Sequence, residues 1–221
     1  MIVRNLRNLI QPLTYTRAFS SVFSKRLAKS LEKELRYEEE DYKIDESVGP
    51  FLQESGFDLE DKEGVSRMRL FKEVEGHEVE VTFSARSPMS EEEEEKEEGE
   101  GEEEEMPNNY CEFQVTIKKK GTNKGLIYEC NSIDSEIQVS NIVYSEEVDS
   151  LSKNSDFFAK NEYRGPDFST LDEKLQNALM DYLKEMGIND DVAIFVESYS
   201  LDKEQRLYMG WLRKMKDFIS I

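Results

Sequence analysis

The residues with the clearest chemical character are the glutamates between Glu91 and Glu105, where twelve of fifteen positions are Glu and one is Lys. Like charges at this density repel one another and would lose hydration on burial, so we predict a solvated, disordered loop over residues 88–107. Dense carboxylates attract basic proteins and cations and repel nucleic acid. The residues expected to bind basic clients are Glu91, Glu92, Glu93, Glu94, Glu95, Glu97, Glu98, Glu100, Glu102, Glu103, Glu104 and Glu105.

Other chemistry has little support in the sequence. His77 is the single histidine, which excludes a histidine-based zinc site, and its place at the start of a hairpin favours a surface residue over a catalytic one. The glutamate run lacks the spaced Asp, Asn and Gly residues of an EF-hand loop, so at most it gathers Ca²⁺ or Mg²⁺ weakly. A pair of catalytic carboxylates stays open as a third alternative. We predict no enzyme, no cofactor and no defined metal site.

The amino terminus has the composition of a targeting signal. The first 30 residues contain six basic residues, no acid and several hydroxyl residues, which is typical of a mitochondrial transit peptide. The run Arg17-Ala18-Phe19-Ser20 resembles a matrix-peptidase site, so we predict a transit peptide over residues 1–19, extending at most to about residue 30. The alternative is a basic amphipathic helix that stays and packs. No apolar run is long enough to cross a bilayer, and no membrane insertion is expected.

The two cysteines, Cys111 and Cys130, indicate a reducing compartment rather than a disulfide framework. Both are predicted to lie on the inner face of strands. A buried reduced pair is favoured, and a cross-strand disulfide requires that the hairpin register place them opposite each other.

The pattern predicts a helix, then a sheet, then two helices. The first helix is predicted over residues 28–41, with an apolar stripe so narrow that it needs a partner helix, and residues 46–56 are predicted to be a connection. Apolar and polar residues then alternate in segments joined by short turns, which predicts a meandering antiparallel sheet with the glutamate run as one hairpin loop. The stripe is Leu27, Leu31 and Leu35, and the strands begin at Phe57 and cover residues 65–73, 79–84, 111–118, 126–130 and 137–144.

Two helices are predicted at the carboxyl end. The first starts at a capping box, Thr170–Glu173, and closes at Gly187. Asn189 is predicted to cap the second helix, in which the polar stretch 200–205 predicts a break or bend. Segregated helices and strands indicate an α+β fold in one acidic domain, residues 27–221. Helix packing or subunit contact is expected for Leu27, Leu31, Leu35, Tyr208, Trp211, Leu212 and Met215.

Four segments carry a resemblance to a known family. They are Tyr163–Phe168 (YRGPDF), Leu171–Gln176 (LDEKLQ), Tyr182–Ile188 (YLKEMGI) and Tyr208–Leu212 (YMGWL). The chain resembles the mitochondrial acidic matrix proteins, also called the mitochondrial glycoprotein or complement-globular-head-binding family. The likeness is densest over the last 60 residues and looser from about Leu27; Met186 departs from the Arg of relatives. By itself, the glycine-proline pair in YRGPDF favours a helix-docking corner over a ligand site.

The resemblance implies a twisted antiparallel sheet of about seven strands with one amino-terminal and two carboxy-terminal helices, in a doughnut-shaped homotrimer. It also implies a non-enzymatic binding protein or chaperone of the mitochondrial matrix that supports ribosome biogenesis, translation, RNA processing and oxidative phosphorylation. Together with the charge, this predicts a protein that holds basic ribosomal or RNA-binding clients without binding nucleic acid itself. The alternative is a Ca²⁺-buffering protein.

Overall fold

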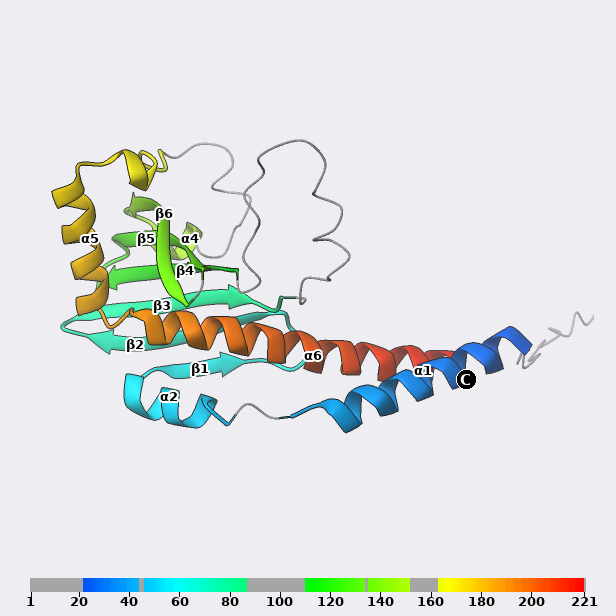
Figure 1. The fold of residues 1–221 in the computed structure, drawn as a ribbon. Helices are drawn as coiled ribbons and strands as arrows, with labels where there is room; N and C mark the ends of the chain where they lie inside the picture. The colour runs from blue at the N-terminus through cyan, green and yellow to red at the C-terminus, as the bar shows by residue number, and fades with distance from the viewer. Residues whose placement is uncertain (1–21, 44–45, 87–109, 134, 152–162, 221) are drawn as a thin grey trace, which may run out of the picture.

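The computed structural model describes residues 22–43, 46–86, 110–133, 135–151 and 163–220. The predicted transit peptide, residues 1–19, and the glutamate-rich loop, residues 88–107, both lie outside the described residues and stay predictions. The described residues form an α+β fold in which helices cover one face of an antiparallel sheet (Figure 1).

The sheet has six strands in sequence order, each antiparallel to its neighbour. The meander predicted from the alternating pattern is therefore confirmed, with six described strands instead of about seven. The strands are β1 (Asp58–Asp61), β2 (Arg67–Val74), β3 (His77–Ser84), β4 (Cys111–Lys119), β5 (Gly125–Ile133) and β6 (Glu136–Ser145).

One face of the sheet forms the main core. Alternate side chains on β3 point to this face, and Val79, Val81 and Phe83 are each at most 2% exposed. They pack against the first half of α6 (Asp190–Ser220), where Phe195 and Val196 are buried. The opposite face is polar apart from a small cluster at one end, which is Ile127, Val143 and Val148. Val148 begins the short helix α4 (Val148–Leu151) in a stretch predicted to be polar.

The segment 46–56 is not the simple connection that the sequence suggested. It contains the helix α2 (Val48–Ser55), whose first turn includes Pro50 and which ends at Gly56 with a left-handed φ of 71°. Proline near the start and glycine just after the end are normal helix boundaries. Phe51 and Leu52 pack against the core, and this burial stabilises a helix too short to persist alone.

The capping box predicted at Thr170–Glu173 is also wrong. The Thr170 hydroxyl donates to the Asp167 carbonyl (2.7 Å) within a 3-10 turn, η1 (Phe168–Thr170). The helix α5 (Glu173–Glu185) is instead capped by Asp172, whose Oδ1 accepts from the Lys174 amide (3.0 Å). The predicted end at Gly187 is confirmed, because this residue has φ 79° and its amide donates to the Lys184 carbonyl (2.8 Å).

The second predicted helix, α6, continues through residues 200–205 without the expected break and runs for 31 residues. The polar residues in this stretch face protein rather than solvent. Lys203 is only 1% exposed, and its Nζ pairs with Asp61 at the end of β1 and donates to the Lys62 carbonyl (2.8 Å). A buried counter-charge from the sheet therefore accommodates the polar stretch, so it does not end the helix.

Beyond this point α6 leaves the sheet and lies beside α1 (Val22–Asp41), forming a two-helix arm (Figure 1). The arm, defined as α1 with residues 204–220, has its own small core of Leu31, Leu35, Met209 and Leu212. The helix α1 begins at Val22, earlier than the predicted residue 28. Its first residues, Val22 and Phe23, are each 81% exposed.

Candidate functional site

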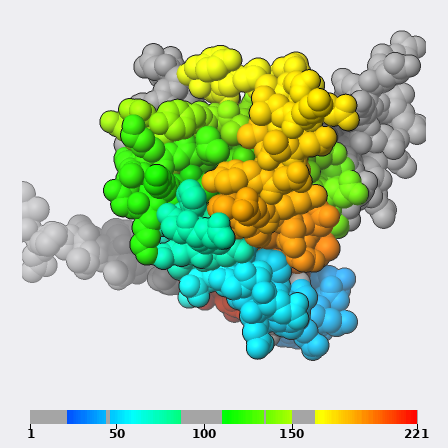
Figure 2. All heavy atoms as spheres, turned by 90° about the vertical axis from the view of Figure 1, so that its left-hand side faces the viewer, coloured from blue at the N-terminus to red at the C-terminus, as the bar shows by residue number. Residues whose placement is uncertain are grey.

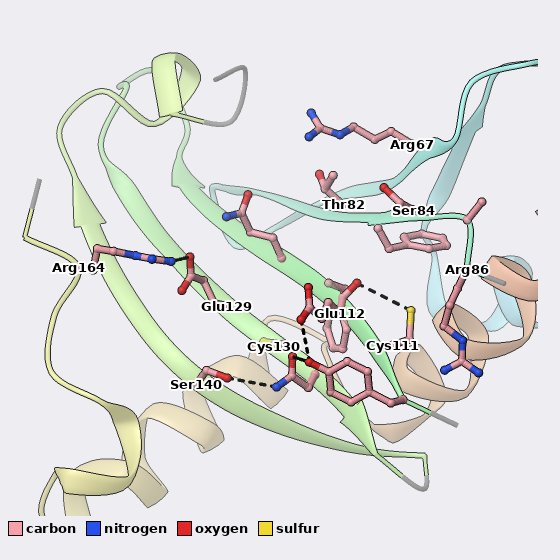
Figure 3. A pocket seen from close by; sticks show the side chains of 16 residues that line it. Arg67, Thr82, Ser84, Arg86, Cys111, Glu112, Glu129, Cys130, Ser140 and Arg164 are labelled. Carbon is pink, nitrogen blue, oxygen red and sulfur yellow. Dashed lines mark hydrogen bonds and ion pairs between the residues drawn. The ribbon is translucent and has the colours of Figure 1, made fainter. Parts of the chain in front are cut away.

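The largest described cavity lies on the sheet face opposite α6 and has a volume of about 890 Å³ (Figure 3). We call it the outer-face cavity. It is open, and its polar side chains come mainly from the strand positions that alternate with the core residues. Its polar lining includes Arg67, Thr82, Ser84, Arg86, Tyr110, Glu112, Gln114, Glu129, Asn131, Ser140 and Arg164.

The carboxylates in this cavity are held by partners. Glu129 on β5 pairs with Arg164 and accepts from the Asn141 side-chain amide (3.3 Å). Glu112 on β4 accepts from the Tyr110 hydroxyl (2.8 Å). Burial, followed by this hydrogen bond, raises the pKa of Tyr110 to about 12, so the phenol stays protonated and keeps donating. These pairings favour a recognition surface over a catalytic carboxylate pair.

Arg164 belongs to the YRGPDF segment, for which sequence favoured a helix-docking corner. Gly165 has φ 80°, and a side chain there would approach the Ile142 carbonyl oxygen of β6 to 2.7 Å. The glycine therefore lets the backbone lie against β6, and this close contact brings Arg164 to Glu129. The segment is a docking corner that also contributes a side chain to the outer-face cavity.

The described residues that flank the glutamate-rich loop lie at this cavity. Arg86, the last described residue before the loop, and Tyr110, the first after it, both line the cavity. The Arg86 amide donates to the Ser200 carbonyl of α6 (3.2 Å), which holds Arg86 against the body. Sequence reasoning missed this cavity, because its lining comes mainly from outward positions on five strands that no local motif connects.

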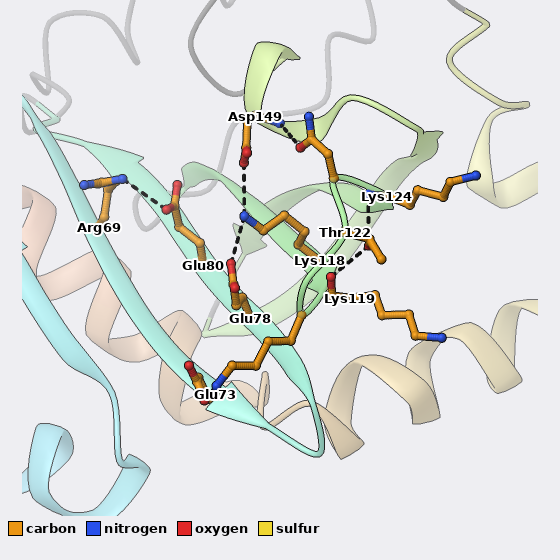
Figure 4. A network of polar contacts seen from close by, with 11 residues as sticks. Arg69, Glu73, Glu78, Glu80, Lys118, Lys119, Thr122, Lys124 and Asp149 are labelled. Atoms are coloured by element: carbon orange, nitrogen blue, oxygen red, sulfur yellow. Dashed lines mark hydrogen bonds and ion pairs between the residues drawn. The ribbon is translucent and has the colours of Figure 1, made fainter.

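The remaining outer face carries alternating charges (Figure 4). Lys118 pairs with Glu78 (2.8 Å) and Asp149 (3.2 Å), and Lys120 pairs with Glu73 (2.6 Å). These hydrogen bonds raise the pKa of both lysines. Exposed pairs of this kind are worth roughly 0–1 kcal/mol each, so they organise the surface more than they stabilise it.

The cysteines are buried and free, which confirms the favoured prediction of a buried reduced pair. The register pairs Cys130 with Phe113 and Cys111 with Ser132, so the two cysteines are not opposite each other. The Cys111 thiol donates instead to the Ser200 hydroxyl (3.6 Å). Burial raises the pKa of both thiols, which makes them poor nucleophiles.

The residues predicted for helix packing or subunit contact divide into two groups within the arm. Leu31, Leu35 and Leu212 are buried between the two helices, with Tyr208 and Met215 partly buried beside them. Leu27 is 46% exposed and Trp211 is 51% exposed. Trp211 stacks on Tyr208 (ring centroids 6.1 Å apart), but its other face is open. The single chain therefore leaves part of the predicted stripe uncovered.

The part of the chain that the structure describes holds no cluster of metal ligands. Among those residues, no group of three or more His, Cys, Asp or Glu side chains is arranged to hold a metal ion. The hypothesis of a Ca²⁺ buffer therefore depends on the glutamate-rich loop. No described helix is long and apolar enough to span a membrane.

Known proteins resemble this chain in sequence. The mitochondrial acidic protein mam33 of Schizosaccharomyces pombe is 28% identical over 215 residues, covering 88% of this chain and 78% of the relative. An uncharacterised mitochondrial protein of Arabidopsis thaliana is 33% identical over 165 residues, covering 74% of this chain and 62% of the relative. These relatives are named as mitochondrial proteins, and the first as an acidic one.

Solved structures show the same fold. The Trypanosoma brucei p22 protein aligns with a TM-score of 0.67 at 22% identity, over 90% of this chain and all of that one (100%). A Leishmania major protein described as a sequence homologue of human p32 gives a TM-score of 0.68 at 22% identity, over 89% and 99%. The model of the family described as "Mitochondrial glycoprotein" matches residues 31–219, so it spans the second half of α1, the sheet and both carboxy-terminal helices. This chain belongs to the mitochondrial glycoprotein family.

Proposed function

We propose that the protein is a non-enzymatic binding protein or chaperone of the mitochondrial matrix that holds basic ribosomal or RNA-binding clients. In this role it supports mitochondrial translation, RNA processing and oxidative phosphorylation. The observation that carries the proposal is the formal net charge of −20, concentrated in the glutamate-rich loop, in a chain of the mitochondrial glycoprotein family. Clustered carboxylates raise the local concentration of cationic partners and cover their RNA-binding faces.

The placement of the loop ends supports this proposal. Because Arg86 and Tyr110 both line the outer-face cavity, a client held by the loop would be kept near Glu112, Glu129 and the neighbouring charged pairs. An open polar surface suits clients of varied shape, since electrostatic attraction requires little geometric fit. We expect client binding to depend on charge more than on any one side chain.

The test is calorimetric titration of the protein with a peptide rich in lysine and arginine from a mitochondrial ribosomal protein. We expect the affinity to fall at least tenfold between low salt and about 0.5 M NaCl, where exposed charges are strongly screened. Replacing the twelve loop glutamates by Gln should remove most of the binding. A control variant replaces exposed α1 glutamates, Glu32, Glu34, Glu39 and Glu40, by Gln and should retain most of it. Binding that survives both the loop substitutions and high salt overturns the proposal.

We also propose that copies of the chain associate through the arm, as three subunits according to the family resemblance. Large apolar side chains are exposed on both arm helices, which a monomer leaves in contact with water. Three loops on one assembly would add avidity for a client with several basic segments. The exposed side chains are Val22, Phe23, Leu27, Tyr37, Trp211 and Phe218.

Sedimentation of the wild type and of Trp211→Ser tests this assembly. We expect the wild type to sediment as a trimer and the variant to dissociate at micromolar concentration, while circular dichroism shows the same helix content. A wild type that is monomeric at all concentrations overturns the assembly proposal and leaves the client proposal to its own test.

A further inference from the structure

Lys72 on β2 occupies a position that the strand pattern assigns to an apolar residue. Met68 and Leu70, four and two residues before it, are fully buried on the face covered by helices. Lys72 points to the same face because side chains alternate along a strand. Lys72 lines a cavity together with residues of α2 and of the start of α6. Figure 2 shows the face of the molecule on which α2 (cyan) and the start of α6 (orange) lie.

The surroundings of the amine are partly apolar. Lys72 Nζ lies 4.1 Å from the centre of the Phe57 ring and donates to the Ser55 carbonyl (3.3 Å). A cavity of about 410 Å³ beside it has an apolar side formed by Phe51, Ile194 and Phe195 and a polar side that includes Glu54, Asn189 and Asp191. A side chain at Gly187 would come within 2.1 Å of Nζ, so the glycine leaves room for the amine.

The amine also lacks a close counter-charge. Among the residues that the structure describes, no carboxylate lies within 4 Å of Lys72 Nζ, whereas Lys118 is held by two. Carboxylates do border its two neighbouring cavities, and they belong to the helices α2, α4 and α6 and to the strands β1, β2 and β3. They are Glu54, Asp191, Asp58, Glu73, Glu78, Glu80 and Asp149. Burial lowers the pKa of Lys72, while the pKa of Lys118 is raised.

We infer that Lys72 is a nucleophilic amine that acyl thioesters modify in preference to the exposed lysines. The cavity is large enough to receive a short acyl chain against its apolar side, and a desolvated lysine is more often in its neutral, reactive form near neutral pH. In the reaction the neutral amine attacks the thioester carbonyl, a C–N bond forms, and the C–S bond breaks. The departing thiolate takes up the proton that the amine loses, so the products are an amide and a free thiol.

The product is an amide without charge. It therefore has no ammonium group to desolvate, and it gives up the cation–π contact that Lys72 Nζ makes with the Phe57 ring. The modification also makes the net charge of the protein more negative by one. The site is separate from the glutamate-rich loop, and the inference stands independently of the proposed client binding.

The test is incubation of the folded full-length protein with acetyl-coenzyme A, followed by mass spectrometry of its peptides over time. At pH 7.4 we expect Lys72 to react at least about threefold faster than the exposed lysines Lys119, Lys174 and Lys214. The preference should shrink as the pH approaches 10, because the exposed amines then also become neutral. A Lys72 that reacts no faster than the exposed lysines at pH 7.4 overturns the inference.

A matched pair of variants separates charge from shape. Ile194 lines the cavity and is 50% exposed, so it tolerates polar side chains. Ile194→Glu places a carboxylate beside the amine, favours its charged form and should slow acetylation of Lys72 about threefold relative to Ile194→Gln. Acetylation of Lys119 and Lys174 should be equal in the two variants. Equal rates at Lys72 in the two folded variants would contradict the role of its desolvated environment.

Discussion

The two halves of α6 belong to the same helix but have different surroundings. In the first half, Phe195 is 2% exposed and stacks between Phe51 (ring centroids 4.3 Å apart) and Tyr199 (5.1 Å). In the second half, Phe218 is 78% exposed and the helix packs against α1 (Figure 1). The first half therefore completes the core of one chain, whereas the second half presents a surface that one chain does not cover.

The junction between the halves is polar. Asp61 at the end of β1 accepts from Lys203, from the Tyr199 hydroxyl (2.8 Å) and from Arg206 (2.8 Å). Burial by itself would raise the pKa of Asp61, but the three hydrogen bonds outweigh it and lower the pKa. This ionic junction joins β1 to the middle of α6, at the point where the arm leaves the body. We therefore expect substitutions in the body to change the stability of the whole chain, and substitutions in the arm to destabilise the arm alone.

The largest expected effect separates two phenylalanines of the same helix. Phe195→Ala should lower the free energy of unfolding by about 4 kcal/mol, because it leaves a cavity among stacked rings. Phe218→Ala should change it by no more than about 0.5 kcal/mol when measured at a concentration where the chain is monomeric. Urea unfolding followed by circular dichroism measures both. Similar losses in the two variants would contradict the distinction between the halves.

A second prediction concerns the junction. Asp61→Asn should cost about 3 kcal/mol, because Lys203 is 1% exposed and would be left without its counter-charge. Adding Lys203→Met removes the buried charge, so the double variant should be more stable than Asp61→Asn alone. Urea unfolding of the wild type, single and double variants gives the comparison. A loss below about 1 kcal/mol for Asp61→Asn would show that the pair does not hold the junction.

A third prediction tests whether the arm opens by itself. Leu35 is 5% exposed between the arm helices, so Leu35→Ala should destabilise the arm by about 2 kcal/mol. Hydrogen exchange should then speed up in α1 and in residues 204–220, while amides of β3 and β4 exchange as in the wild type. Phe195→Ala serves as the control, because it should speed up exchange in the sheet as well. Equal acceleration everywhere in Leu35→Ala would mean that arm and body unfold as one unit.

The smallest expected effect is a dependence on acid. The pKa of Asp61 is lower in the folded state than its ordinary value of about 3.8. The ionised carboxylate therefore makes its full contribution to folding stability above about pH 3.8, and this contribution is lost as the pH falls through the folded-state pKa. The difference in melting temperature between the wild type and Asp61→Asn should therefore be constant near neutral pH and shrink below about pH 4. A difference that stays the same down to pH 3 would assign the stabilisation to packing rather than charge.

Several elements followed directly from local patterns. The alternation in β3 and β4 predicted the inward faces correctly, and Gly187 predicted the end of α5. The wrong predictions occurred where a contact that the local pattern does not show decides the outcome. The capping residue of α5 is Asp172 because the preceding turn already uses the Thr170 hydroxyl, and nothing in the spacing of the capping box reveals that turn.

The sequence by itself determined the order of helix and strand, the acidic character and the family, because periodicity, charge and motif are properties of nearby residues. Only the tertiary structure decided that α6 is continuous, since the counter-charge of Lys203 comes from Asp61, 142 residues away. It likewise decided the short helix α2 and the lining of the outer-face cavity. Long-range packing compensates for weak or polar local patterns, and that compensation is invisible until the distant elements meet.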